Sequence, residues 1–338
     1  MTLTTEHAAV TAVRAPRPAA APAAPAQRAE PRAEYRLFRA AVVRREPLGP
    51  NGARVTFSSP ELAGFGAGGF DQRLKLLLPQ VPLEALGAPR GDWYAWWRAL
   101  PQEVRPVMRT YTVRALRPAG PGADAELDVD FVLHGVRGGA AGPAATWAAN
   151  ARPGDEVALV GPTAPGGGRM WGVEWAPPPE ARTLLLAGDE TAVPAVCAVL
   201  EQLPAGARAL AVLEVPEISD AVDVRSAAEV TVEWLPRGGR HAHGALLVPR
   251  VEEVAGPLLD AASRTLDPDL EDVDVDAGIL WDVPERAVAA GPQCLYAWLA
   301  GEAGVVKRLR RHLVREVGLP RASVAFMGYW REGRAEGA

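Results

Sequence analysis

The sequence predicts a β + α/β fold class: a six-stranded antiparallel barrel, followed by a parallel-sheet domain with helices on both faces. The 338 residues are enough for two domains that each bury a core. Six short β-like runs, separated by Gly and Pro turns, lie before residue 162. After the prolines at 177–179, continuous apolar strands alternate with helical stretches, which is typical of a parallel sheet covered on both faces.

These patterns divide the chain into three parts. Residues 1–33 are rich in Ala, Pro and Arg. We expect them to form a disordered tail, because such a segment cannot bury enough apolar surface to offset its chain entropy. The barrel domain is expected at 34–178 and the α/β domain at 179–334, with an acidic insertion at about 252–285.

Composition excludes several classes of protein. A net charge of -5 gives no reason to expect binding to nucleic acid or to an anionic membrane. No apolar run reaches the roughly 18 residues that a membrane span needs. Cys197 and Cys294 are too few for a disulfide scaffold or a cysteine-ligated cluster, and they fit a reducing compartment. We therefore expect a cytoplasmic protein that binds neither nucleic acid nor membrane. A monomer is expected, although no pattern in the sequence determines the oligomeric state.

The barrel strands are read from β-branched and apolar runs that end at turn residues. They are expected at 37–45, 53–58, 73–78, 110–116, 126–133 and 156–160. No long helical pattern separates them, so an antiparallel arrangement follows.

The fourth of these runs carries the densest polar chemistry. On a strand, Arg109, Tyr111 and Val113 share one face, and the intervening threonines share the other with Arg114. A cation beside an aromatic plane suits a flat anionic ligand such as a flavin nucleotide, since Arg pairs with phosphate and Tyr stacks on a ring. An ordinary strand with solvated arginines is the alternative.

A second anion-binding feature follows the fifth run. Gly142 and Pro143, with the small residues after them, suit the start of a helix whose first N–H groups are unpaired. Such a helix end favours a pyrophosphate. His134, at the end of the preceding strand, could contact a flavin or a ribose, or it could be a structural histidine.

In the α/β domain, strands are expected at 183–187, 209–215, 230–234, 295–300 and 324–329. Helices are expected at 192–203, 245–259 and 302–317. Ligands of such sheets bind at the carboxyl ends of the strands, and both Gly188–Thr191 and Gly301–Glu302 lie at such ends. No G-x-G-x-x-G follows the first strand, which argues against a standard dinucleotide-binding oxidoreductase.

No metal site is expected. His241 and His243 lack further ligands nearby. The acidic stretch at 252–285 has the spacing of a calcium loop but lacks its central Gly and terminal Glu, so a solvated loop insertion is expected there.

Taken in order, the motifs resemble the siderophore-interacting proteins of the ferredoxin reductase-like superfamily. The matching segments are Arg109-Thr110-Tyr111-Thr112-Val113-Arg114, Val132-Leu133-His134-Gly135, Gly142-Pro143-Ala144 with Trp147-Ala148, Leu186 to Pro194, Trp298 to Glu302, and Gly328-Tyr329-Trp330-Arg331. The match runs from about Tyr35 to Gly333. The resemblance implies a cytoplasmic ferric-siderophore reductase that uses FAD and either NADH or NADPH.

The resemblance also implies the site residues. The cofactor-binding residues would be Arg109, Tyr111, Thr112, Val113, His134, Gly142, Pro143, Ala144, Thr146, Trp147, Asp189, Glu190, Thr191, Gly301, Glu302 and Trp330. The substrate would be a ferric siderophore, with anionic catecholate or mixed types favoured, and its contacts would be Lys75, Arg331 and Arg169. The Gly-rich loop before Arg169 places that cation later than relatives tend to.

The chemistry needs a flavin, because a hydride donor delivers two electrons and Fe(III) accepts one. An outer-sphere electron step needs no acid–base residue, so no catalytic side chain is assigned. Two other functions remain open. One is a general NAD(P)H–flavin or ferredoxin-type reductase, and the other is a non-catalytic protein that binds ferric chelates.

Overall fold

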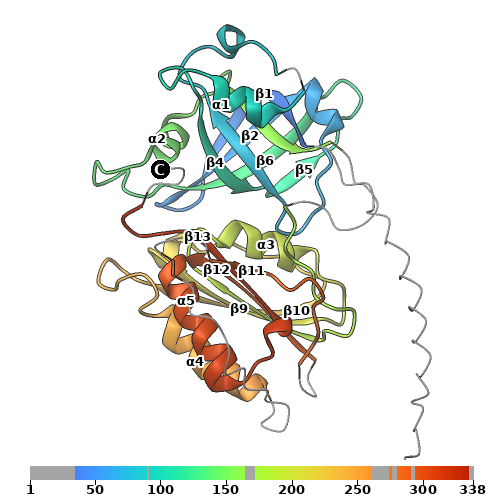
Figure 1. Cartoon of the computed structure of the whole chain (residues 1–338), viewed down its shortest axis with the longest axis vertical. Coiled ribbons are helices and arrows are strands. Elements are labelled where there is room, and N and C mark those ends of the chain that lie inside the picture. The colour runs from blue at the N-terminus through green and yellow to red at the C-terminus, as the bar shows by residue number, and fades with distance from the viewer. Residues whose placement is uncertain are drawn as a thin grey trace, which may run out of the picture.

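The computed structural model describes residues 35–89, 91–163, 172–259, 274–275, 280–290 and 294–334. Two sheets stack along the long axis of the molecule, with the N-terminal sheet above the C-terminal one in Figure 1. The expected tail at 1–33 and Arg169 lie outside the described residues.

The first sheet is antiparallel throughout and curls on itself. Its strands are β1 (Tyr35–Pro47), β2 (Gly52–Ser59), β3 (Arg73–Leu78), β4 (Val107–Thr112), β5 (Ala115–Arg117), β6 (Ala125–Val132) and β7 (Glu156–Pro162). They follow the order β4-β3-β7-β1-β2-β6-β5. Alternate residues of these strands point inward and build one core, with Phe38, Phe57 and Leu76 fully buried.

The prediction of six strands was wrong by one. The run at 110–116 is two strands, because the chain changes partners between them. The backbone N–H of Val113 donates to Gln72, beside β3, whereas that of Arg114 donates to Asp128 on β6. This crossing from one end of the sheet to the other brings its two edges together. Side-chain alternation continues through the crossing, so the sequence pattern could not reveal it.

Short helices lie in the connections of the first sheet, and one helix packs against its strands. The short helices η1 (Pro60–Gly64), η2 (Leu83–Leu86) and α1 (Trp93–Ala99) lie in the connections between the first four strands. Helix α2 (Pro143–Asn150) packs against β2, β4 and β6, with Ala144 and Ala148 buried in the barrel core. Arg45 fixes its far end by donating to the carbonyl oxygen of Ala148 at 2.8 Å.

The second sheet has the order β10-β9-β8-β12-β13-β11. Strands β8 (Thr183–Gly188), β9 (Arg208–Val215), β10 (Glu229–Pro236), β12 (Leu295–Glu302) and β13 (Val324–Trp330) are parallel, as predicted. Strand β11 (Trp281–Asp282) is antiparallel to β13, so the sheet is mixed rather than purely parallel. Two residues carry no periodicity, which is why the sequence did not indicate this strand.

Part of the expected acidic insertion at 252–285 is regular structure, and its residues 260–273 and 276–279 lie outside the described residues. Helix α4 (Leu247–Leu258) includes its first acidic residues, Glu252 and Glu253, and β11 lies near its end. On an amphipathic helix those carboxylates belong to the solvent side, while Val251 and Ala255 enter the core.

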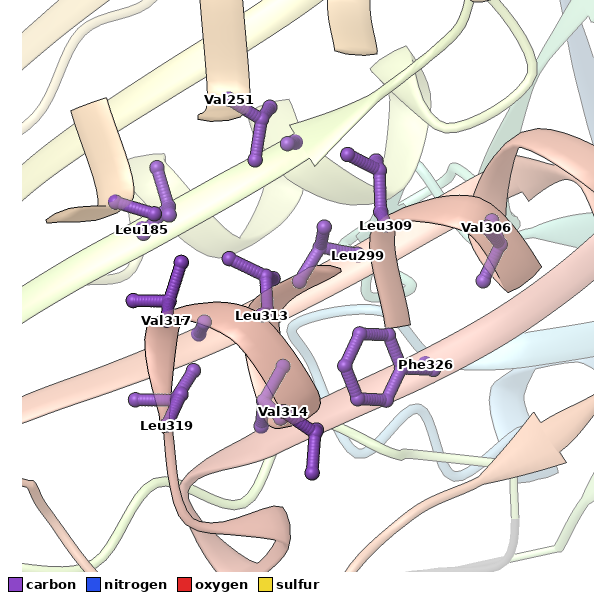
Figure 2. Close-up of a cluster of buried hydrophobic side chains, with 14 of the residues drawn as sticks. Leu185, Val251, Leu299, Val306, Leu309, Leu313, Val314, Val317, Leu319 and Phe326 are labelled. Carbon is purple, nitrogen blue, oxygen red and sulfur yellow. The ribbon is translucent and has the colours of Figure 1, made fainter. Parts of the chain in front are cut away.

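Helices lie on both faces of the second sheet, as predicted. Helix α3 (Val193–Glu201) covers the face toward the first domain, and α4 and α5 (Ala303–Arg311) cover the other (Figure 1). Helix α5 continues as a π-helical turn at His312–Val317, and η3 (Ile218–Asp220) and η6 (Arg321–Ser323) are short 3-10 turns. Figure 2 shows how Val251, Leu309 and Leu313 from the helices pack on Leu299 and Phe326 of the sheet.

Polar contacts join the two domains. Asp71, fully buried, accepts the backbone N–H groups of Glu174 and Trp175 in the linker, and Arg73 pairs with Glu174 at 2.7 Å. Arg114 donates to the Glu201 carboxylate of α3 at 2.7 Å. These contacts hold the barrel against the linker and against the last residue of α3, whereas the predicted site residues lie at the carboxyl ends of β8 and β12.

In the part of the chain that the structure describes, no helix has the length and apolarity to cross a membrane.

Candidate functional site

The flavin-side residues of the prediction lie on β4. Arg109 pairs with Leu76 and Tyr111 with Leu74 in the register with β3, so both side chains start from the inward face of the strand pair. The Tyr111 ring lies 4.4 Å from that of Phe131, centroid to centroid. Arg109 also donates to the carbonyl oxygen of Met108 at 2.8 Å.

Three aromatic rings continue this surface toward α2. Phe131 lies 5.8 Å from Trp147, which stacks on Phe57 at 6.1 Å and 12°. Tyr111 and Trp147 are therefore brought together through a ring between them. Tyr111 and Trp147 are half-buried, whereas Thr112 and Val113 are buried, so the last two present mainly backbone to any ligand.

The start of α2 is open. Gly142 is the N-cap, is exposed and has no heavy atom within 4 Å of where a Cβ would lie. Pro143 occupies the first turn and no side chain caps the helix, while Ala144 is buried beneath it and Thr146 is exposed. A helix start with no capping side chain favours an anionic group.

The coenzyme-side residues of the prediction meet at the carboxyl ends of β8, β12 and β13. The carboxylate of Asp189, 3% exposed, accepts the backbone N–H of Glu302 at 2.7 Å and the indole Nε1–H of Trp330 at 2.8 Å. It also accepts the backbone N–H and the hydroxyl of Thr191. Burial, and then the nearby charge of Glu190, raise the pKa of Asp189 to about 6.

The next residue is part of a buried ion cluster. Glu190 accepts two hydrogen bonds from the Arg237 guanidinium, at 2.6 and 2.7 Å. Arg237 also lies 3.3 Å from Glu214, which in turn accepts backbone N–H groups at the start of α4 from Gly244, Leu246 and Leu247. Although burial opposes ionisation, the hydrogen bonds of Arg237 keep the pKa of Glu190 below its ordinary value.

The two halves of the candidate site meet at His134. Its Nδ1 lies 3.6 Å from the Glu190 carboxylate, and its ring lies 6.0 Å from that of Trp330. His243, from the loop after β10, packs edge-on to Trp330 at 4.7 Å. The barrel-side histidine therefore touches the carboxyl edge of the second sheet.

Gly301 allows Asp189 to approach β12. Its φ is +145°, and a Cβ built on it would lie 2.6 Å from an oxygen of Asp189. The next residue, Glu302, caps α5 by accepting the backbone N–H of Val305 at 2.8 Å. The predicted Gly301–Glu302 pair thus shapes the carboxyl end of β12 through backbone geometry.

We expect Gly301→Ala to lower the free energy of unfolding by about 1–3 kcal/mol, because the backbone there is strained for any side chain and the Cβ overlaps a buried carboxylate. Gly256→Ala is the matched control, since Gly256 lies in α4 with open space around its Cβ position. That variant should gain roughly 0.5–1 kcal/mol. Urea unfolding measures both, and equal effects of the same sign would contradict the expectation.

The two predicted substrate residues that the structure describes, Lys75 and Arg331, lie in different domains and bond different partners. Lys75 lies on β3 opposite Thr110, and its Nζ donates to that hydroxyl at 2.6 Å, on the face away from Tyr111. Arg331 follows β13, where the chain turns toward the first domain (Figure 1), and donates to the carbonyl oxygen of Val275. Arg169 lies outside the described residues.

Both halves of the chain match known families. A family model described as Siderophore-interacting FAD-binding domain matches residues 41–166, and one described as Siderophore-interacting protein matches residues 181–333. An uncharacterised protein of Mycobacterium tuberculosis is 34% identical over 301 aligned positions, and the alignment covers 87% of this chain and 90% of that protein. The chain belongs to the siderophore-interacting protein family.

Other relatives are consistent with this family. Ferric vibriobactin reductase ViuB of Vibrio cholerae is 28% identical over 298 residues, covering 88% of this chain and 90% of ViuB. The crystal structure of the siderophore-interacting protein SipS from Aeromonas hydrophila matches with a TM-score of 0.58 and 31% identity, over 90% of this chain and 95% of SipS. A siderophore utilization protein from T. fusca gives 0.62 and 26%, over 91% and 97%. The predicted resemblance and fold class are confirmed.

The residues present fit the FAD that this siderophore-interacting family binds. The half-buried Tyr111 and Trp147 offer aromatic surface, Arg109 adds a cation on the same strand face, and the uncapped start of α2 lies beside them. Together they provide a stacking plane and two anion-binding elements, which a flavin dinucleotide requires.

Three residues of this family member's site were missed from the sequence. Phe131 could have been found, since it lies on the inward alternation of β6. Arg237 follows the end of a predicted strand, where a polar residue merits attention. His243 was considered only as a metal ligand, and among the described residues no group of three or more His, Cys, Asp or Glu could hold a metal ion.

Proposed function

We propose that this protein is a cytoplasmic ferric-siderophore reductase that uses FAD and NAD(P)H. The observation that carries the proposal is the junction at His134, where the flavin-side surface of the barrel touches the carboxyl edge of the second sheet at Glu190 and Trp330. A flavin and a nicotinamide must meet for electrons to pass between them. The name of the relative ViuB, a ferric vibriobactin reductase, supports the same reaction.

In this proposal the barrel holds FAD. Arg109 and the start of α2 would bind the pyrophosphate, and Tyr111 would stack on the flavin ring. FAD, when bound, accepts an electron pair from the nicotinamide and gives single electrons to Fe(III). The packed rings of Phe131 and Trp147 keep water from the barrel side of the site.

The second sheet receives the coenzyme. Polar groups at the carboxyl ends of β8 and β12 form the receiving edge, as in other open α/β sheets. Arg237 offsets only one of the two buried carboxylates that it contacts, Glu190 and Glu214, so this cluster adds no positive charge to the receiving edge. Electron transfer to Fe(III) requires no proton-transferring side chain, and we assign none.

The proposed substrate is an anionic ferric catecholate or mixed-type siderophore. Lys75 and Arg331 supply the positive charge that would attract it, each from one of the two domains. The chain has only two lysines, and the rarity of this residue type favours a functional role for Lys75.

We expect Lys75→Ala and Arg331→Ala each to raise the KM for an anionic ferric catecholate by roughly two- to fivefold, the size of a solvent-screened charge contact. Reduction of the flavin by NAD(P)H should not change. Added salt should shrink the effect, because screening acts over about 8 Å at physiological ionic strength. Lys307→Ala, which removes the other lysine from α5, is the control. Equal losses for a neutral hydroxamate complex would remove the electrostatic explanation.

The experiment for the function itself is a turnover assay. Fe(II) formation is followed with a ferrous chelator, using NADH or NADPH, in the presence of a ferric siderophore or of free flavin with simple ferric iron. Faster turnover with the siderophore supports the proposal. Faster turnover with free flavin would indicate a general flavin reductase, and no turnover with bound FAD would indicate a chelate-binding protein.

A further inference from the structure

All the accepting positions of the Asp189 carboxylate are used within the chain. Its Oδ1 accepts the backbone N–H and the hydroxyl of Thr191, and its Oδ2 accepts the backbone N–H of Glu302 and the indole N–H of Trp330. An ionised carboxylate offers about four lone-pair sites. The group is also 3% exposed. It has neither the surface nor the acceptors to bind a coenzyme hydroxyl.

Three of these four donors belong to the turn after β8 or to the end of β12: the backbone N–H and hydroxyl of Thr191, and the backbone N–H of Glu302. The fourth is different, because it fixes a large side chain rather than a strand end. The Trp330 indole is half-buried and has His243 edge-on at 4.7 Å and His134 of the barrel at 6.0 Å. Its hydrogen bond to Asp189 therefore sets the plane of an aromatic ring at the contact between the domains.

The chain beyond Trp330 is held as well. The backbone N–H of Glu332 lies 3.3 Å from the Glu302 carboxylate, whose other oxygen caps α5. Gly301 leaves the space into which Asp189 reaches, since a Cβ there would lie 2.6 Å from Oδ2. Several separate features thus converge on holding Trp330 and its neighbours in one position.

We propose that Asp189 is a positioning residue: it fixes the Trp330 indole as the wall on which the nicotinamide ring of the coenzyme is received, and it does not touch the coenzyme. This inference rests on the proposed function. A flat, half-exposed ring at the carboxyl edge of the sheet is a stacking surface for another flat ring. A ring that is already fixed loses little rotamer freedom when its ligand binds, which favours affinity.

The test is a double-mutant cycle with Asp189→Asn and Trp330→Phe, made in the FAD-loaded protein. Asn keeps the size of Asp but turns an N–H₂ group toward two donors, while Phe keeps a ring but has no N–H. Binding of NADP⁺ and of NAD⁺ is measured by calorimetry. The indole N–H signals of the ten tryptophans are recorded by NMR without coenzyme, and the signal missing from Trp330→Phe identifies Trp330.

We expect Asp189→Asn to shift the Trp330 indole signal and to weaken binding of the preferred coenzyme about three- to tenfold. The same variant should raise the KM for that coenzyme more than it lowers kcat. Trp330→Phe should weaken binding to a similar extent, and the double variant should be no weaker than the weaker single one. Asp71→Asn is the matched control, because Asp71 is equally buried and also accepts backbone N–H groups, but at the domain linker. It should change neither binding nor the indole signal.

Two results would overturn the inference. Additive losses in the double variant, or weakened binding with an unmoved indole signal, would mean that Asp189 acts on the coenzyme directly or through the fold. If Asp189→Asn does not fold, Trp330→Ala decides the question, since unchanged coenzyme binding in that variant would show that the Trp330 ring does not receive the nicotinamide. Failure of the native protein to bind either coenzyme would instead contradict the proposed function, and the variants are compared only against native binding.

Discussion

Replacing Arg237 with methionine is expected to lower the free energy of unfolding by about 3–5 kcal/mol, because it leaves Glu190 and Glu214 buried without their cation. Among the residues that the structure describes, this guanidinium alone bridges the two carboxylates. Its loss also affects the start of α4, whose backbone N–H groups Glu214 accepts. Chemical denaturation measures the change.

The control for this prediction is Arg250→Met. Arg250 pairs with Glu233 at 2.6 Å with similar geometry, but the pair lies at the surface, so water replaces the lost partner. Its effect should be much smaller. A comparable loss in both variants would mean that the Arg237 cluster owes nothing to burial. Adding Glu190→Gln to Arg237→Met should restore part of the stability, since it removes one stranded charge.

Arg109→Ala is expected to weaken FAD binding roughly 10- to 150-fold, the effect of losing a charged hydrogen bond of about 1.5–3 kcal/mol. The fold should persist, because the inward contacts of β4 come from Val107 and Tyr111. The FAD affinity of Arg109→Lys should lie between those of the native protein and Arg109→Ala, since lysine keeps the charge but loses the guanidinium's paired donors. Equilibrium titration of the apoprotein with FAD measures the affinities.

A control for this second prediction is Arg98→Ala, which removes an exposed arginine from α1. FAD affinity should not change. Full flavin occupancy and native affinity in Arg109→Ala would show that this arginine belongs to an ordinary strand, and the phosphate contact would then have to come from the start of α2 alone.

The fold could be predicted wherever the information was local. The runs Leu184–Ala187 and Leu295–Ala300 are apolar because both faces of β8 and β12 are covered, and such runs are visible without any structure. The crossing at Val113 was not visible, because the change of hydrogen-bonding partner from β3 to β6 leaves the side-chain alternation intact. Strand β11 was missed because two residues have no period.

For the candidate site too, local features could be predicted and distant partners could not. Asp189, Glu302 and Trp330 were named from motifs, yet no pattern indicated that the Asp189 carboxylate joins the other two residues. Arg237 was missed because its partners are distant: Glu190 is 47 residues away in the sequence and Glu214 is 23. Pairing of that kind depends on the order of the strands in the sheet. Residue types predict chemistry, whereas partner choice needs the fold.

We propose that electrons pass from NAD(P)H through bound FAD to a ferric siderophore. The most direct measurement of this transfer is an anaerobic absorbance experiment on the FAD-loaded protein. NADH or NADPH should bleach the flavin band, and a ferric siderophore added afterwards should restore it while Fe(II) appears, with two ferric ions consumed for each flavin. A flavin that stays oxidised with both coenzymes, or a bleached flavin that the ferric siderophore does not reoxidise, would contradict the account.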